Sequence, residues 1–143
     1  EGFRELEVSG KIIESRVYNT YHGLWRYFTV DDGKIDLIHD NYLMIGTIEA
    51  YLKTVEYFGK EKIVPVLLEL DDGIRLKRAL EREMQEEKPR YQEMCRRFLA
   101  DAEDFSEEKI KKANIVRKFV NDELNSCLGE IKKYIENEIV NVR

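Results

Sequence analysis

The stretch Ile74–Asp101, IRLKRALEREMQEEKPRYQEMCRRFLAD, holds six arginines within a chain of 143 residues whose formal net charge is −5. Arginine concentrated against the overall charge indicates a local anion site, because a planar guanidinium contacts two phosphate oxygens at once and stays charged at any working pH. Glutamates are interleaved with these arginines, so the pattern also fits a solvent-exposed helix with ion pairs four residues apart. The stretch alone leaves both interpretations open.

Pro89 divides this stretch. Proline lacks the N–H donor of a helix interior and clashes with the preceding turn, so we expect two helices joined by a charged hinge. Arg78 and Arg82 share one face of the first helix, while Arg96 and Arg97 lie beyond the hinge. Folding at the hinge brings both groups to one phosphate chain. The expected helices are Leu76 to about Glu86 and Tyr91–Ala102.

The chain before residue 41 predicts a small, largely antiparallel lobe. Three short segments are rich in β-branched and aromatic residues and are separated by turns that contain Asn, Asp and Gly. These predicted strands are Lys11–Arg16, Leu24–Val30 and Lys34–His39.

From residue 41 onward, predicted strands and helices alternate. Alternation of this kind predicts an α/β fold with a parallel core sheet, in which ligands bind at the carboxyl ends of the strands. Length and composition predict a single domain. The expected strands are Asn41–Ile45, Ile63–Leu70 and Val116–Val120. The expected helices are Ile48–Phe58, one from the cap Ser106 to about Ala113, and a final helix capped by Asn121-Asp122-Glu123.

Composition excludes several classes of function. No apolar run approaches the roughly 20 residues of a membrane helix and no leader resembles a signal peptide, so we expect a cytoplasmic protein without a membrane partner. The acidic net charge argues against a nucleic-acid partner. Cys95 and Cys127 lie far apart and no His/Cys cluster accompanies them, so we expect reduced thiols and no metal-ligating residues.

Two segments in the second half of the chain resemble guanylate kinases, a family of nucleoside monophosphate kinases. Arg78, Arg82 and Arg97 resemble the family's lid arginines, where R-x-x-x-R on a helix precedes a polar lid and a paired R-R or K-R. The segment Phe119–Leu124, FVNDEL, resembles the I-V-N-D-D-L motif near the family's C-terminus.

Two segments near the start extend the resemblance over nearly the whole chain. Gly10–Glu14, GKIIE, is similar to the family's G-x-F-L-E segment, and Tyr27–Thr29, YFT, is similar to its Y-G-T/S partner. The resemblance implies phosphoryl transfer from ATP to GMP, giving ADP and GDP with Mg²⁺ in purine nucleotide metabolism. It also implies a P-loop kinase-like three-layer α/β fold. Its parts would be a GMP-binding lobe (1–40), a core (41–77 and 102–143) and a helical lid (78–101).

The resemblance implies a GMP-binding site at Glu14, Tyr27 and Thr29. Glu14 would accept hydrogen bonds from the ring N–H and the exocyclic amine of guanine, two donors that adenine does not present together. Thr29 would donate to the guanine carbonyl, and the phenol of Tyr27 would reach the GMP phosphate. An exposed strand position for Glu14 and aromatic packing for Tyr27 are the alternatives.

The resemblance also implies an ATP site in the arginine-rich stretch. Arg82 and Arg97 would close over the ATP phosphates and stabilise charge on the transferring group, with Arg78 and Arg96 as supports. Asn121 would contact adenine, and a role as a helix cap is compatible with that contact. The remaining arginines are interpreted as ordinary surface charge: Arg75 and Arg90.

The chain departs from the family pattern in three places. Extra residues, including Tyr21-His22-Gly23, separate Glu14 from Tyr27, and MIGT at Met44–Thr47 stands where an acidic D-I-D motif is expected. Neither the phosphate loop GxxxxGK[ST] nor T-T-R-x-x-R occurs in residues 1–143. We expect both to precede Glu1, and residues 1–143 alone to be inactive. A catalytically inactive, guanylate-kinase-like protein-binding module is the alternative function.

Overall fold

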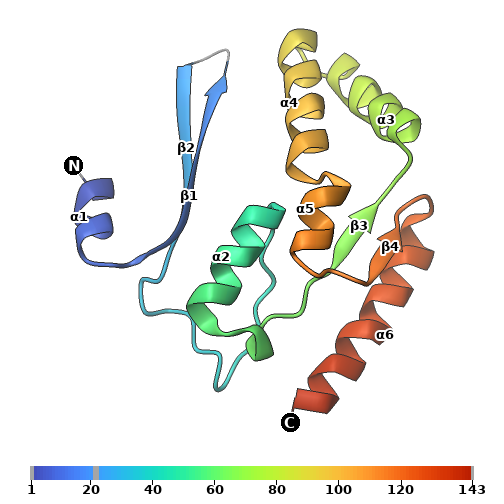
Figure 1. Ribbon diagram of the computed structural model, residues 1–143. Coiled ribbons are helices and arrows are strands. Elements are labelled where there is room, and N and C mark those ends of the chain that lie inside the picture. The colour runs from blue at the N-terminus through green and yellow to red at the C-terminus, as the bar shows by residue number, and fades with distance from the viewer. Residues whose placement is uncertain (1, 21–22, 143) are drawn as a thin grey trace. The chain divides into compact units, whose positions relative to one another are not determined.

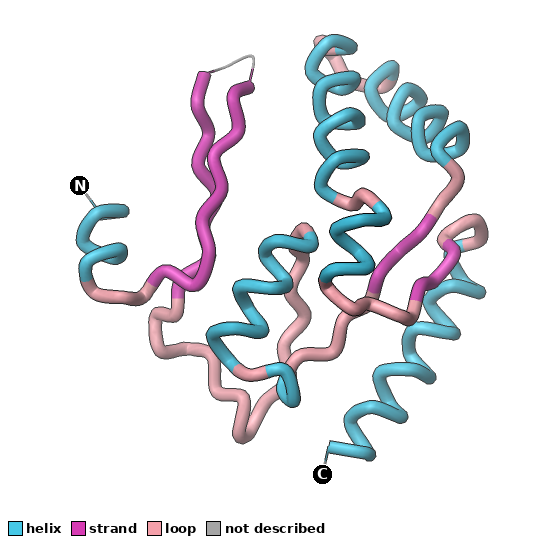
Figure 2. The backbone as a smooth tube through the Cα atoms, in the orientation of Figure 1, coloured by secondary structure: helices cyan, strands magenta, loops and turns pink. Residues whose placement is uncertain are grey.

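The computed structural model describes residues 2–20 and 23–142, and side chains as far as Glu138. It divides the chain into two compact units, Glu1–Ile63 and Val64–Arg143. Both units contain helices and strands, so the fold is mixed α/β as predicted (Figures 1 and 2).

An antiparallel hairpin forms the sheet of the first unit. Strand β1 (Ile12–Thr20) pairs with β2 (Gly23–Val30), which confirms the first two predicted strands (Figure 2). The register shifts by a bulge between Ile12 and Glu14, and both Ile13 and Glu14 are buried. The bulge therefore turns two consecutive side chains away from solvent, which a regular strand does not do.

Helices accompany this hairpin. Helix α1 (Gly2–Val8), which the sequence did not predict, places the ring of Phe3 5.2 Å from that of Phe28 on β2. Helix α2 (Ile48–Phe58) has the predicted bounds and contacts β1. It begins there because the Thr47 hydroxyl accepts a hydrogen bond from a main-chain N–H of the first turn. A single 3₁₀ turn follows at Lys60–Lys62.

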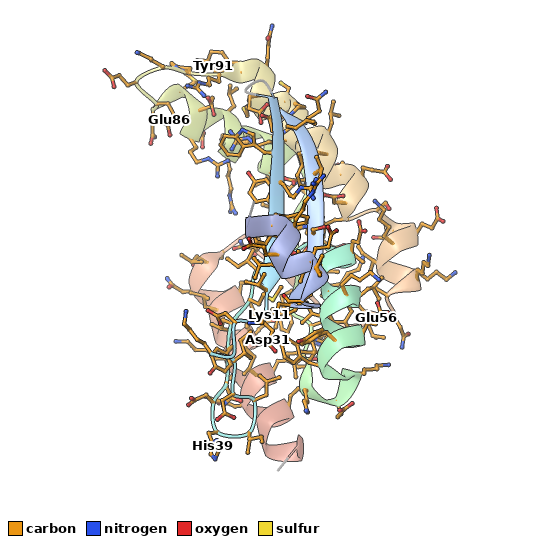
Figure 3. All side chains as sticks on the ribbon, turned by 90° about the vertical axis from the view of Figure 1, so that its left-hand side faces the viewer. Lys11, Asp31, His39, Glu56, Glu86 and Tyr91 are labelled. Atoms are coloured by element: carbon orange, nitrogen blue, oxygen red, sulfur yellow. The ribbon has the colours of Figure 1, made fainter. Side chains whose placement is uncertain are left out.

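The predicted strand Lys34–His39 is wrong. The Asp36 carboxylate accepts hydrogen bonds from the main-chain N–H groups of Ile38 (3.0 Å) and His39 (3.3 Å). Such local side-chain bonds to the backbone compete with a sheet ladder. The segment is therefore a turn, with His39 near its tip in Figure 3.

The predicted strand Asn41–Ile45 is also wrong. The segment is irregular, and Leu43 and Ile45 are 93% and 99% exposed. A buried strand needs neighbouring strands that take its backbone hydrogen bonds. Within residues 2–20 and 23–142 no strand pairs with this segment, so its β-branched and apolar composition alone does not make it a strand.

Two short parallel strands form the sheet of the second unit. Strand β3 (Leu67–Glu69) pairs with β4 (Lys118–Val120). The parallel pairing of these two predicted segments is confirmed, although both strands are shorter than expected. In the described part of the chain this sheet has two strands, so a clear three-layer core is not present.

Between these strands the arginine-rich stretch forms two helices, as Pro89 predicted. Helix α3 (Asp72–Met84) and helix α4 (Tyr91–Asp104) contact each other and meet at a turn, which Figure 3 marks by Glu86 and Tyr91. Helix α3 begins four residues earlier than expected. The reason is Asp71, whose carboxylate accepts hydrogen bonds from two N–H groups of the first turn.

Helix α5 (Glu107–Lys112) leads from α4 toward β4. Ser106 precedes it as predicted, but its hydroxyl makes no capping hydrogen bond. The helix ends at Lys112, and two residues later the positive φ of Asn114 (53°) reverses the chain and lets the N–H of Ile115 bond to the carbonyl of Ile110. Both isoleucines are buried, so this turn joins α5 to the core.

Helix α6 (Leu124–Val142) closes the second unit. The Glu123 carboxylate accepts hydrogen bonds from the main-chain N–H groups of Asn125 (3.0 Å) and Ser126 (2.6 Å), so the expected cap is made by Glu123 rather than Asn121. Tyr134 of this helix packs against Phe119 of β4, with ring centroids 5.4 Å apart.

The packing of β4 gives a test of the second unit. Phe119 is 1% exposed, and Phe119→Ala leaves a cavity that we expect to lower the free energy of unfolding by about 3–5 kcal/mol. Urea unfolding followed by circular dichroism measures the change. The neighbouring Val120, 55% exposed, supplies the control: Val120→Ala should change stability by less than about 0.5 kcal/mol. Equal effects of the two substitutions would contradict this packing.

Candidate anion-binding site

Helices α3 and α4 enclose a cleft of about 360 Å³ in the second unit. Four arginines and one aspartate line it, so its formal charge is +3. Met94 and Phe98 add apolar surface, which strengthens electrostatic attraction because it excludes water. The charged lining residues are Arg75, Arg78, Arg82, Arg97 and Asp101.

The cleft brings together three of the four arginines expected to bind ATP: Arg78, Arg82 and Arg97. Arg96 is not among the lining residues, and its guanidinium bonds to Glu93 through Nε (2.9 Å) and Nη2 (2.7 Å). The interpretation of Arg75 as ordinary surface charge is wrong, because Arg75 also lines the cleft. Its distance of seven residues from Arg82 places both on one helix face, and this spacing was the available signal.

A buried carboxylate, Glu83, connects the two helices. Glu83 is 6% exposed and accepts a hydrogen bond from the main-chain N–H of Arg90, the residue just before α4. Its Oε2 also lies 3.7 Å from Nη2 of Arg97. The sequence suggested an exposed glutamate, but Glu83 follows Ala79 by one helical turn and so faces α4 with it.

Arg78 is held by main-chain oxygens. Its two terminal nitrogens donate to the carbonyls of Asn121 and Asp122, each at 2.8 Å. The N–H of Asn121 in turn bonds to the carbonyl of Glu69 at 2.9 Å. Arg78 therefore brings the predicted adenine contact, Asn121, next to the cleft and joins α3 to the turn before α6.

Arg82 and Arg75 have unused donors. Within the described residues, the Arg82 guanidinium has no hydrogen bond or ion pair. The Arg75 guanidinium lies 4.4 Å from the ring centroid of Phe98 and 3.2 Å from a carboxylate oxygen of Asp72. Its Nε is buried and has no hydrogen-bond partner among these residues, a situation that costs about 1–3 kcal/mol.

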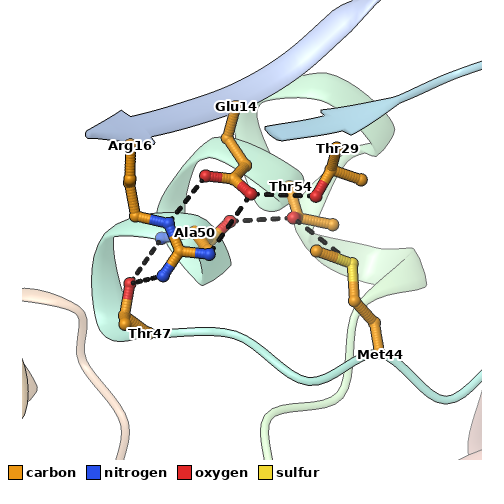
Figure 4. A network of polar contacts seen from close by, with 7 residues as sticks. All are labelled: Glu14, Arg16, Thr29, Met44, Thr47, Ala50 and Thr54. Carbon is orange, nitrogen blue, oxygen red and sulfur yellow. Dashed lines mark hydrogen bonds and ion pairs between the residues drawn. The ribbon is translucent and has the colours of Figure 1, made fainter. Parts of the chain in front are cut away.

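The first unit brings two of the three expected GMP-binding residues, Glu14 and Thr29, into contact (Figure 4). Glu14 is buried, and its Oε1 accepts a hydrogen bond from the Thr29 hydroxyl at 2.8 Å. Arg16 donates to the same carboxylate through Nε (2.9 Å) and Nη2 (3.4 Å). Burial lowers the pKa of Arg16, but the hydrogen bond and charge of Glu14 outweigh it and raise that pKa above its usual value.

Arg16 also connects the hairpin to α2. Its Nη1 donates to the hydroxyl of Thr47 at 3.0 Å, the same oxygen that caps α2 (Figure 4). Sequence reasoning missed Arg16, although its position two residues after Glu14 on a strand places both on one face. The carboxylate already receives three of the about four hydrogen bonds that it can accept, so a ligand with two donors would have to replace at least one of the two from Arg16.

Tyr27 occupies the same face of the hairpin, opposite Arg16 in the register. Its ring lies 5.8 Å from Tyr18 and 6.3 Å from Trp25, and Tyr27 itself remains 47% exposed. The alternative of aromatic packing is therefore present, without complete burial. Tyr21 and His22 lie outside the described residues.

Comparison of the chain with protein-family models, with curated proteins and with solved structures finds no match. In the described part of the chain, no group of three or more His, Cys, Asp or Glu side chains is placed to hold a metal ion. Within the same residues, no helix has both the length and the apolar character that crossing a bilayer requires.

The Glu14 network predicts a large effect of losing its arginine. Arg16→Met leaves a buried carboxylate without its counter-charge, and we expect the free energy of unfolding to fall by about 3 kcal/mol. Fluorescence of Trp25, the one tryptophan in the sequence, reports urea unfolding of this hairpin. Lys53→Met removes an exposed pair with Glu56 and should leave the midpoint unchanged. A stable Arg16→Met protein would show that the ion pair does not support the hairpin.

Loss of the buried Glu83 carboxylate is expected to destabilise the packing of α3 against α4. Glu83→Ala removes the acceptor of the first N–H before α4 and the charge beside Arg97, and should lower the free energy of unfolding by about 1–2 kcal/mol. Glu81→Ala, two residues away and exposed, should change it by less than about 0.5 kcal/mol. Urea unfolding followed by circular dichroism measures both, and equal values would contradict the bridging role of Glu83.

Proposed function

We propose that this chain belongs to a guanylate kinase, which transfers a phosphoryl group from ATP to GMP in the cytoplasm. The observation that carries the proposal is the cleft between α3 and α4, where the expected arginines Arg78, Arg82 and Arg97 meet around one space. A surface helix with paired charges does not require such convergence. The resemblance of the sequence motifs suggests the family, and the arginine-lined cleft supports binding of phosphates.

The arginines would act on the phosphates of ATP. Arg82, with no partner among the described residues, and Arg97, whose carboxylate contacts are as long as 3.7 and 3.9 Å, are the cations most available to a ligand. Guanidinium groups aimed at the transferring phosphoryl group stabilise the charge that develops on it. Arg78 would act indirectly, because it positions the turn that contains Asn121.

The hairpin would select the base. Glu14 and Thr29 already lie in hydrogen-bond contact, and together they offer two carboxylate oxygens and one hydroxyl to the edge of a guanine. Guanine would take the place of Arg16, which keeps a second hydrogen bond to Thr47 when it leaves Glu14. Tyr27, on the same face, would reach the phosphate of GMP.

The remaining parts of the proposal concern the core and the metal. A three-layer kinase-like core would require further strands beside β3 and β4. The family resemblance implies that Mg²⁺ would accompany the phosphates of ATP, and among the described residues Asp101 is the one carboxylate that lines the cleft. The roles proposed for the arginines of the cleft and for the hairpin residues do not depend on this ion.

A protein-binding module without catalysis is the second candidate. One observation favours it: large apolar side chains of β2 remain exposed, including Leu24 (75%), Trp25 (48%) and Phe28 (42%). Such side chains are enriched in protein interfaces. In this alternative the cleft arginines are dispensable for binding, whereas the hairpin side chains are essential.

A coupled assay of ADP formation, made on the protein as encoded by its gene, distinguishes the candidates. We expect GMP-dependent ADP formation that falls about 100- to 1,000-fold in Arg82→Met and in Arg97→Met. Lys77→Met is the control, because Lys77 is an exposed cation of α3 outside the cleft, and its activity should match the unaltered protein.

Two results would overturn the kinase proposal. One is an encoded protein without a GxxxxGK[ST] loop and without GMP-dependent ADP formation. The other is full activity in both arginine variants. Retention of partner binding in the arginine variants, together with no turnover in any form, would instead support the binding module.

A further inference from the structure

We propose that Arg75 is a phosphate ligand of the α3–α4 cleft and makes the cleft selective for linked phosphates over a single phosphate. This inference rests on the proposed function and names the ligand class of the same site. Sequence reasoning treated Arg75 as surface charge, and the family resemblance assigned it no role.

The Arg75 guanidinium uses only part of its hydrogen-bonding capacity. Nη2 pairs with Asp72, while the buried Nε has no hydrogen-bond partner among the described residues. Buried donors are almost always satisfied, so an orphaned one in a cleft indicates a partner that binds there. Rotation of the guanidinium away from Phe98 would turn this donor toward a ligand.

Arg75 lies at the end of the cleft opposite to Arg82 and Arg97. Arg75 and Arg82 are seven residues apart on α3, which corresponds to about 10 Å along the helix axis. Arg97 lies toward the Arg82 end, because it contacts Glu83. Arg75 lies toward the other end, where Arg78 bonds to the turn that contains Asn121.

A chain of linked phosphates fits this arrangement of arginines. A single phosphate held by Arg82 and Arg97 does not extend over two helical turns, whereas a chain of linked phosphates does. In a nucleotide, Arg75 would then contact the phosphates nearest the nucleoside, and the other two arginines would contact the terminal ones. The formal charge of +3 suits a multiply charged anion.

Calorimetric titration of residues 1–143 with tripolyphosphate and with orthophosphate tests the inference at low ionic strength, where screening is weak. We expect tripolyphosphate to bind more tightly. Arg75→Met should weaken tripolyphosphate binding about 10- to 100-fold, the equivalent of one or two charge-assisted hydrogen bonds, and leave orthophosphate binding nearly unchanged.

Three variants serve as comparisons. Arg75→Lys keeps the charge without the planar fork and should lie between Arg75→Met and the unaltered chain. Arg82→Met should weaken binding of both anions. Lys77→Met, an exposed cation of the same helix, should weaken neither. A circular dichroism melt of each variant shows whether it remains folded.

The outcomes separate the two proposals. If Arg75→Met binds tripolyphosphate like the unaltered chain while Arg82→Met does not, this inference is overturned and the proposed function stands. If Arg75→Met weakens both anions equally, or if Lys77→Met has the same effect, the length selectivity is overturned. If Arg82→Met binds both anions normally, the phosphate role of the cleft fails, and the proposed function fails with it.

Discussion

The buried carboxylate of Glu83 is the interaction on which the candidate site depends. Four arginines around one cleft repel one another, so a negative charge beside them favours the packing of the two helices. Glu83 supplies that charge to Arg97 and accepts the N–H of Arg90, so it joins the end of α3 to the start of α4. The other three arginines of the cleft lie on α3 and line the same space, although Arg78 and Arg82 remain partly open to solvent.

A buried glutamate paired with an arginine is also present in the first unit. Glu14 is buried between the strands of the hairpin, and Arg16 neutralises it while bonding to the cap of α2. In both units a buried glutamate and an arginine connect elements that are separate in sequence. An ion pair whose carboxylate is buried is weak evidence for high stability, but removal of its arginine leaves that carboxylate without a counter-charge and is costly. Each pair includes a residue that the kinase proposal assigns to a nucleotide, Arg97 in the cleft and Glu14 in the hairpin.

Local signals predicted most of the elements. Pro89 separated α3 from α4, apolar spacing gave α2 its exact bounds, and the turn at Asp31–Gly33 ended the hairpin strand. The failures have two causes. Asp36 binds nearby N–H groups and converts a predicted strand into a turn, while Asn41–Ile45 has no neighbouring strand with which to pair. The composition of a segment shows whether it is compatible with a β-strand, but the strand forms only where a neighbouring strand can pair with it.

The candidate site was predictable in part for the same reason. The convergence of Arg82 and Arg97 followed from a hinge and a helical period, and the contact of Glu14 with Thr29 followed from two motifs on paired strands. Burial was not readable from residue type, so Glu83, Arg16 and Arg75 were missed. Their spacing placed them on the correct faces, but charged residues usually remain exposed.

A ¹H–¹⁵N spectrum of the arginine Nε–H groups during a titration with ATP tests most directly whether the cleft between α3 and α4 binds phosphate. We expect the signals of Arg82, Arg97 and Arg75 to shift together and to saturate at one ATP concentration. The signal of Arg117, which lies outside the cleft, should remain in place. Uniform small shifts of all arginine signals, without saturation, would contradict a phosphate site between α3 and α4.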